Sequence, residues 1–155
     1  MSNKFDFSIL GLDEVTKKLG NLSVELGDAA GRRAARKAFG IVARSARENA
    51  LLVDDSETGR RIRDNIRLQF ASRFYRDTGD IMYRVGVATR KGRIPKGNPD
   101  EGPKGNTPHW HLVELGTEKA RAQPFLRPAL SENVSKVMDK LVTELDKEIT
   151  KELAK

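Results

Sequence analysis

The amino-acid sequence predicts an α+β domain, with N-terminal helices, a small and mostly antiparallel sheet, and a long C-terminal helix packed on the sheet. Apolar residues recur with helical spacing near both ends of the chain. Two segments between them alternate apolar and polar residues, as half-buried strands do. A length of 155 residues suits one domain over residues 1–155 and is too short to favour two.

Two helices are predicted in the N-terminal part. Residues 5–26 show helical spacing of leucine and valine, and Asp13 and Glu14 suit a first turn. Glycines within residues 27–31 indicate a break or a new cap. A longer helix then covers residues 32–52, with alanines and other apolar residues gathered on one face.

The opposite face of this longer helix carries a basic ridge, with only Glu48 as an acid beside it. The ridge consists of Arg32, Arg33, Arg36, Lys37, Arg44 and Arg47. A solvated helix usually places acids at i,i+4 to its bases, and this face has only Glu48 in such a position. The ridge therefore fits either a solvated surface or one that faces DNA phosphates or an acidic partner. The net charge of +7 favours encounters with polyanions in general.

The middle of the chain predicts an antiparallel hairpin. Residues 66–70 and 83–87 alternate with period two, so each strand has one face toward the core and one toward water. The Arg-Asp-Thr-Gly-Asp segment at residues 76–80 suits a turn between them. Residues 89–108 then contain four of the six prolines and four glycines with almost no apolar residue. That composition predicts a long, exposed and mobile loop.

The C-terminal third is predicted to contain a short strand over residues 109–115, ended by Gly116, and an extended segment over residues 124–128. From about Ala129 a helix is expected to run to the end of the chain. Its apolar stripe consists of Leu130, Val134, Val137, Met138, Leu141, Leu145, Ile149 and Leu153. From Ser131 on, acids and lysines nearly balance, as on a solvated outer face.

No motif in the sequence indicates catalysis, a metal or a cofactor. His109 and His111 would share one strand face, but neither a cysteine nor a third histidine exists to complete a metal site. The nucleotide-binding, zinc-protease and serine-hydrolase signatures are absent. A hydrolase that uses Glu114 and His111 is the weakest alternative. The prediction is a protein that is not an enzyme, with no cofactor and no small-molecule substrate. No run of residues is long and apolar enough to be expected in a membrane.

Two motifs in the C-terminal third carry a resemblance to a known family. They are His111-Leu112-Val113-Glu114-Leu115-Gly116-Thr117 and Gln123-Pro124-Phe125-Leu126-Arg127-Pro128-Ala129-Leu130. The chain resembles the gene-product-ten group of lambda-like tailed bacteriophages, known as head–tail joining, neck or tail-completion proteins. The upstream segments 58–66 and 85–87 follow in the same order, so that the resemblance extends from about Leu12 to Leu141.

The physical chemistry of the motif residues agrees with an architectural role. Gly116 can adopt the positive φ that a sharp turn needs, Thr117 can bond the backbone there, and Glu114 can anchor the turn or pair with Arg127. Phe125 and Leu126 are expected to dock the last helix onto the sheet. The complete assembly and turn motif comprises Glu114, Gly116, Thr117, Pro124, Phe125, Leu126 and Pro128.

The resemblance implies a virion structural protein that completes the tail or joins it to the head as a ring-forming neck subunit. Its implied partners are further copies of itself and other phage neck or tail proteins, with non-specific DNA contact in the channel and no membrane. Its implied location is the head–tail junction of the virion, after assembly in the bacterial host cytoplasm. The basic N-terminal part and the more acidic C-terminal helix would suit head-to-tail pairing of subunits. The alternative is a stand-alone, sequence-independent nucleic-acid-binding protein that uses the basic ridge.

Overall fold

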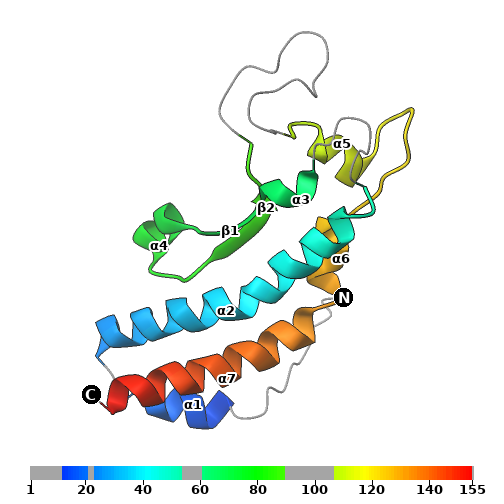
Figure 1. The fold of residues 1–155 in the computed structure, drawn as a ribbon. Helices are drawn as coiled ribbons and strands as arrows, with labels where there is room; N and C mark the ends of the chain where they lie inside the picture. Colours follow the sequence, from blue (N-terminus) through cyan, green and yellow to red (C-terminus); the bar gives the residue numbers. More distant parts are fainter. Residues whose placement is uncertain (1–11, 21–22, 54–60, 90–106, 155) are drawn as a thin grey trace, which may run out of the picture.

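A long helix, α2 (Val24–Ala50), runs through the middle of the molecule, with a β-hairpin on one side and a second long helix on the other (Figure 1). The computed structural model describes residues 12–20, 23–53, 61–89 and 107–154. The other elements in chain order are α1 (Leu12–Leu19), α3 (Ile62–Asn65), β1 (Ile66–Phe70), α4 (Ser72–Thr78), β2 (Tyr83–Val87), α5 (Trp110–Leu115), α6 (Leu126–Ser131) and α7 (Val134–Leu153).

The break predicted at residues 27–31 is wrong, because α2 continues through them without interruption. Glycine inside a helix costs up to about 1 kcal/mol relative to alanine. At Gly31 the absence of a side chain avoids a close contact, because a Cβ there would lie 2.9 Å from Cδ1 of Ile81. Glycine at this position lets the end of the hairpin connection approach the helix. The actual break falls earlier, between α1 and Val24.

The packed face of α2 is built mainly from small side chains. Its buried residues are Ala30, Ala34, Ala35, Ala38, Val42, Ala43, Ala46 and Ala50. Small residues let two helix backbones approach closely, and α7 packs along α2 over most of its length. The short helix α1 lies against α7, where Val15 joins Ala30 and Ile149 in a small core of its own.

The predicted strands and their antiparallel pairing are confirmed. Ile66 pairs with Val87 and Phe70 with Tyr83, while Arg67 and Gln69 are exposed on the outer face. The connection differs from the predicted turn, because α4 precedes the turn and Gly79 ends this helix with φ 79°. The left-handed conformation of Gly79 is the usual end of a helix.

The strand predicted at residues 109–115 is wrong, because α5 is a helix. Trp110, Val113 and Glu114 face the protein interior, and their spacing is helical. Over so few residues, the apolar positions of this segment fit the period of a strand as well as the period of a helix. Thr107, which precedes α5, is fully buried and accepts a hydrogen bond from Asn65.

The extended segment predicted at residues 124–128 holds only for its first part, because α6 begins at Leu126. Pro128 lies in the first turn of α6, where a missing N–H costs no helical hydrogen bond. The predicted single C-terminal helix is divided at Asn133, whose side-chain amide donates to the carbonyl of Ala129 and to Ser45 of α2. This amide fixes the junction between α6 and α7.

The predicted α+β class is confirmed. One main core joins α2, α3, the hairpin, α6 and the first half of α7, so the long C-terminal helix packs on the same core as the sheet. Most of the loop predicted at residues 89–108 lies outside the described residues. In the part of the chain that the structure describes, no helix has the length and apolar character needed to cross a membrane.

Candidate functional site

Glu114 ties the turn motif together from a buried position on α5. Its side chain is 4% exposed. Oε2 accepts hydrogen bonds from the main-chain N–H groups of Phe125 (2.7 Å) and Leu126 (3.0 Å), and Oε1 accepts from the N–H of Arg127 (3.1 Å). These donors open α6, whose first N–H groups have no partner within the helix. Glu114 therefore caps α6 from a different helix.

The side chain of Arg127 completes this arrangement. Its Nε lies 3.3 Å from Oε1 of Glu114 and its Nη2 donates to the main-chain carbonyl of Glu114 at 2.9 Å. Burial by itself would raise the pKa of Glu114. The three main-chain N–H groups and the guanidinium of Arg127 oppose it and leave the pKa below its ordinary value. The carboxylate is thus held ionised, and with it the position of α6 relative to α5.

Gly116 and Thr117 turn the chain back after α5. Gly116 has φ 79° and ψ 176°, a conformation found almost only in glycine. The Thr117 hydroxyl accepts hydrogen bonds from the N–H groups of Lys119 (3.2 Å) and Ala120 (3.0 Å). Gln123 then donates to the carbonyl of Val113 at 2.8 Å, which closes the loop onto α5.

We expect Gly116→Ala to lower the free energy of unfolding by about 2 kcal/mol. The reason is that the backbone conformation of Gly116 costs any other residue about 1–3 kcal/mol. The new Cβ would also lie 2.7 Å from the main-chain N of Ala122, so the loop would have to move. Urea denaturation followed by circular dichroism measures the change. Gly40→Ala is the matched control, since nothing lies within 4 Å of a Cβ there. An unchanged midpoint for Gly116→Ala would contradict this account of the turn.

Phe125 anchors the motif in the main core. Its side chain is fully buried among residues of α2, α3 and β1, and its carbonyl accepts a hydrogen bond from Asn49 of α2 at 3.2 Å. Leu126 is half-buried against the same core, while Pro124 is exposed. The motif residues are thus brought together as one unit, and the aromatic side chain is the part that docks it.

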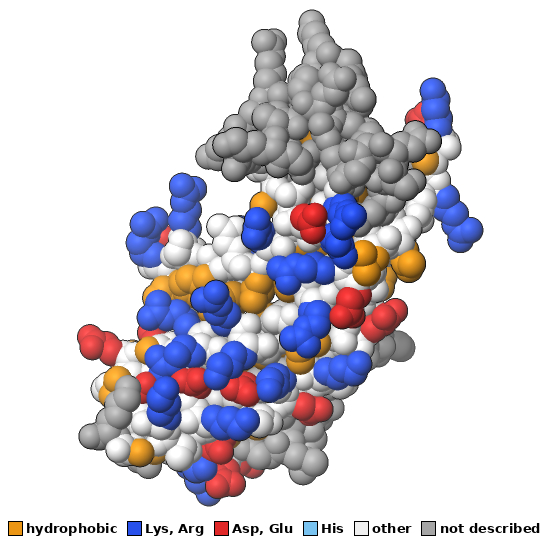
Figure 2. Space-filling model, in the orientation of Figure 1, with side chains coloured by type: hydrophobic (Ala, Val, Ile, Leu, Met, Phe, Trp, Pro, Cys, Tyr) orange, Lys and Arg blue, Asp and Glu red, His pale blue; other side chains and the backbone are white. Residues whose placement is uncertain are grey.

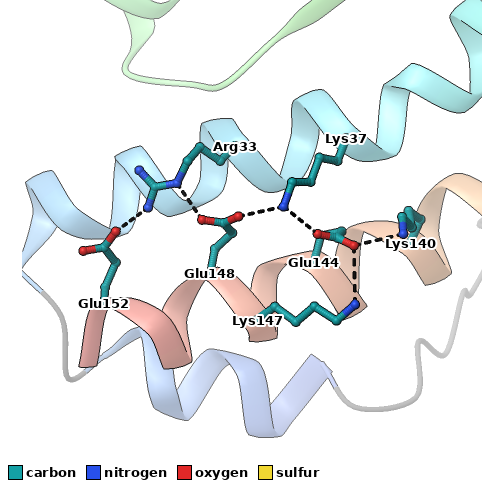
Figure 3. Close-up of polar contacts among 7 residues, drawn as sticks. All are labelled: Arg33, Lys37, Lys140, Glu144, Lys147, Glu148 and Glu152. Atoms are coloured by element: carbon teal, nitrogen blue, oxygen red, sulfur yellow. Dashed lines mark hydrogen bonds and ion pairs between the residues drawn. The ribbon is translucent and has the colours of Figure 1, made fainter. Parts of the chain in front are cut away.

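The six residues of the basic ridge do not share one environment. Arg33 and Lys37 turn toward α7, where they meet Glu144, Glu148 and Glu152 (Figure 3). Arg32 lies over the rings of Phe70 and Tyr75, with centroid distances of 5.7 and 5.3 Å. Arg47 donates to the carbonyl of Ile66 at 3.0 Å. Arg36 and Arg44 are exposed, without a carboxylate partner among the described residues.

We call the contact between α2 and α7 the ion-pair ladder. Its members are Arg33, Lys37, Lys140, Glu144, Lys147, Glu148 and Glu152. Lys37 bridges Glu144 (2.9 Å) and Glu148 (2.8 Å), and Arg33 bonds Glu148 at 2.6 Å and also reaches Glu152. The expectation that the acids of the C-terminal helix form a solvated outer face is wrong for these three carboxylates, which are at most 8% exposed.

The charges of the ladder shift one another's proton affinity. Hydrogen bonds from Lys37 and Lys140 lower the pKa of Glu144 to about 2, and bonds from Lys37 and Arg33 lower the pKa of Glu148. The pKa values of Lys37 and Arg33 are raised in return. A carboxylate with a depressed pKa stabilises the fold at pH values above its ordinary pKa, and this stability is lost as it becomes protonated.

We therefore expect the free energy of unfolding to fall as the pH drops below about 4.5, the ordinary pKa of a glutamate, toward the pKa of about 2 of Glu144. Glu148→Gln should flatten this dependence, because its pKa is also depressed. Urea midpoints across the acidic range measure the slope. Glu132→Gln, at an exposed position, is the control and should keep the wild-type slope. Equal slopes in all three proteins would show that the ladder does not set the acid stability.

The two histidines lie at the start of α5, with His109 at its N-cap. His111 is exposed, and Trp110 between the histidines packs against the main core. Within the described ranges, no group of three His, Cys, Asp or Glu residues could hold a metal ion.

An apolar groove that the sequence did not predict lies between α2, β2 and α6. The groove has a volume of about 290 Å³ and is lined by Phe39, Val42, Tyr83, Val85, Leu126, Arg127 and Leu130. Its residues come from three distant segments, so no local pattern reveals it. Figure 2 shows apolar side chains between the hairpin and α2, and a mixed row of basic and acidic side chains along the contact of α2 with α7.

Comparison with known proteins agrees with the resemblance. The family model described as "Bacteriophage HK97-gp10, putative tail-component" matches residues 13–116, which is more than half of the chain. The match spans α1 to Gly116 and so includes Glu114, whereas residues 123–130 of the turn motif lie beyond it. No curated protein and no solved structure matches the chain. The chain therefore belongs to the HK97-gp10-like family of bacteriophage tail components.

Proposed function

We propose that this protein completes the phage tail or joins it to the head, as one subunit of a ring at the neck. Membership of a family of bacteriophage tail components is the observation that carries the proposal. The protein is then a structural part of the virion, located at the head–tail junction after assembly in the bacterial cytoplasm. Its partners are other copies of itself and the neighbouring neck or tail proteins.

The apolar groove is the feature of the structure that supports this proposal. A ring needs heterologous contacts, in which one patch of a subunit meets a different patch of the next. The apolar groove beside α6 is one such patch. The sequence suggested that the basic part of one subunit would pair with the acidic helix of the next. In the structure, Arg33 and Lys37 already form ion pairs with α7 of the same chain. We therefore expect apolar contacts, more than these charges, to hold neighbouring subunits together.

DNA contact enters the proposal only at basic residues that remain exposed. Arg36 and Arg44 of the ridge are exposed on α2, as are Arg67 and Arg84 on the outer face of the hairpin. Contacts from such side chains to DNA passing through the ring would be to phosphates and independent of sequence. A stand-alone nucleic-acid-binding protein that stacks bases is disfavoured, since Arg32 already lies over the nearby aromatic rings.

Deletion of the gene from the phage, followed by electron microscopy of the lysate, tests the joining role. We expect separate filled heads and unattached or overlong tails. Addition of the purified protein should restore joined, infectious particles, and a buffer addition serves as the control. Normal infectious particles from the deletion phage would overturn the proposal.

A separate titration tests the DNA contact. We expect double-stranded DNA to bind weakly and less tightly as salt rises, with each phosphate contact contributing about 0.9 to the slope of log affinity against log salt. Arg36→Ala/Arg44→Ala should reduce that slope by about two contacts, whereas Lys17→Ala on α1 should not change it. An unchanged slope in the double variant would remove DNA contact by α2 from the proposal.

A further inference from the structure

The outer edge of β2 offers main-chain groups for a further strand. Ala71 donates to Met82 across the hairpin at 2.9 Å, so the even-numbered residues of β2 bond to β1 in this antiparallel register. The N–H and C=O groups of Tyr83, Val85 and Val87 therefore point away from β1. In the described part of the chain the sheet has two strands, and no main-chain group bonds to this edge.

The apolar groove lies beside this free edge. The groove is lined by Tyr83 and Val85 of β2, by two residues of α2, and by Leu126, Arg127 and Leu130 of α6. Side chains of a strand alternate between its two faces. A strand added to β2 would thus place every second side chain in the groove while its backbone bonds to β2, which is the usual geometry of strand addition to a sheet edge.

The edge of β1 is less suited to such an addition. Its first carbonyl, that of Ile66, already accepts a hydrogen bond from Arg47, and α4 follows the strand almost directly. Edge strands that carry apolar residues on one face are prone to pair with other chains unless charge or cover blocks them. The side of β2 that faces the groove carries no charged side chain, because its only arginine, Arg84, is exposed on the other face.

The N-terminal segment of the chain has the pattern that this site requires. The helical spacing noted within residues 5–26 is carried by the residues from Leu12 on. In Lys4-Phe5-Asp6-Phe7-Ser8-Ile9-Leu10, by contrast, two phenylalanines and an isoleucine alternate with polar residues. With the apolar residues at positions 5, 7 and 9 in the groove, Lys4, Asp6, Ser8 and Leu10 would lie on the outer face of the sheet. Arg84 and Arg67 are exposed on that face, so Asp6 would meet opposite charge.

We propose that residues 4–10 of a second copy of this chain bind the free edge of β2 as a third strand, with Phe5, Phe7 and Ile9 in the apolar groove. This inference rests on the proposed function, and names the contact between neighbouring subunits. The donor segment and the acceptor groove are different patches, so each copy can give one strand and receive one. Contacts of this heterologous kind produce closed rings when the rotation permits.

The geometry of one copy favours the neighbour as the donor. The segment leads into α1, which packs on α7, while the hairpin lies on the opposite side of α2 (Figure 1). Val15 of α1 shares a core with Ala30 of α2, so at least two packing distances of about 10 Å, from α1 to α2 and from α2 to the hairpin, separate α1 from β2. An extended chain covers about 3.3 Å per residue, and only one residue stands between the segment 4–10 and Leu12, so the segment of one copy is too close to α1 to pair along its own β2.

Photo-crosslinking between isotopically distinct copies tests the proposal. The full-length protein with a benzoyl-phenylalanine in place of Phe7 is prepared with ordinary and with heavy nitrogen, mixed in equal amounts, concentrated and irradiated. We expect mixed-isotope crosslinks between position 7 and the residues of the groove. The same probe at Ser8 should give few crosslinks to the groove, because alternate side chains face the other side of the strand.

Leu130→Glu supplies the matched test on the acceptor side. Leu130 is 51% exposed, so the variant should fold, but its carboxylate would be desolvated by an incoming strand. We expect the crosslink yield to fall at least about tenfold, which corresponds to about 1.4 kcal/mol. Leu52→Glu, at a position 87% exposed and outside the groove, should retain the wild-type yield.

The outcomes separate this inference from the joining role. Crosslinks within one copy, crosslinks to another surface, or none at all would overturn the strand donation. If these results accompany unjoined heads and tails in the deletion phage, only the inference fails. If mixed-isotope crosslinks to the groove form while the deletion phage is normal, the contact stands and the joining role fails.

Discussion

Phe125→Ala is expected to lower the free energy of unfolding by about 3–5 kcal/mol, the range for removing a buried aromatic side chain. Phe125 is fully buried where α2, α3 and β1 meet α6, among residues such as Val42, Ile62 and Ile66. Two of these neighbours belong to short elements that cannot close over the cavity without moving. The effect should therefore appear as lost stability of the whole domain.

Thermal denaturation of the purified variant, followed by circular dichroism, measures this loss. For a domain of this size the midpoint of thermal unfolding should fall by roughly 6–20 °C, at about 2–4 °C per kcal/mol. Leu112→Ala is the control, because Leu112 is 46% exposed on α5 and such changes usually stay within about 0.5 kcal/mol. Similar midpoints for the two variants would show that Phe125 does not anchor the core.

Glu114→Ala is expected to destabilise the protein by about 3 kcal/mol. The change leaves the N–H groups of Phe125, Leu126 and Arg127 without their acceptor, and an unsatisfied buried donor costs about 1–3 kcal/mol. Arg127 is more exposed and can turn to water, which limits the loss from the ion pair. Because the lost hydrogen bonds lie at the start of α6, local unfolding of the variant should begin in α6 rather than in α7.

The pH dependence distinguishes the carboxylate from simple packing. The pKa of Glu114 lies below its ordinary value of 4.5 in the folded protein. Its ionised form therefore stabilises the fold above that pH, and the stabilisation is lost as the pH falls through the depressed pKa. The difference between wild type and Glu114→Ala should shrink in acid. Glu118→Ala, exposed in the same loop, should match wild type at every pH, and a constant difference for Glu114→Ala would refute the capping role.

Local patterns predicted the hairpin because its two strands each have a wet and a dry face. Arg67 and Gln69 face solvent between residues that face α2, and no helix produces this alternation. The strand predicted around α5 was wrong because its local pattern is ambiguous. Seven residues are too few to separate the two periods, and the decisive residue is Glu114, a charged side chain whose burial depends on partners that lie eleven to thirteen residues away.

The ion-pair ladder could not be predicted from either helix alone. Arg33 and Lys37 lack acids at i,i+4 on α2 because their acids stand on α7, more than 100 residues later in the chain. The same separation made the glutamates of α7 look solvated. The pairing of Glu114 with Arg127 was one of two roles expected for this acid, because both residues belong to the same short motif. The apolar groove was not, because it exists only after three segments have packed.

The central position of α2 also sets how the protein can open. Its middle turns contact the hairpin, α6 and α7 at once, so their amide hydrogens should exchange with solvent only when the whole domain unfolds. By contrast, α4 has no buried residue, and its amides should exchange through local fraying within minutes. Native-state hydrogen exchange should then show slow amide exchange in the middle of α2 and fast amide exchange in α4, at the tip of the hairpin. In the proposed ring, the tip of the hairpin could therefore change its conformation against a neighbouring subunit while the helices behind it stay folded.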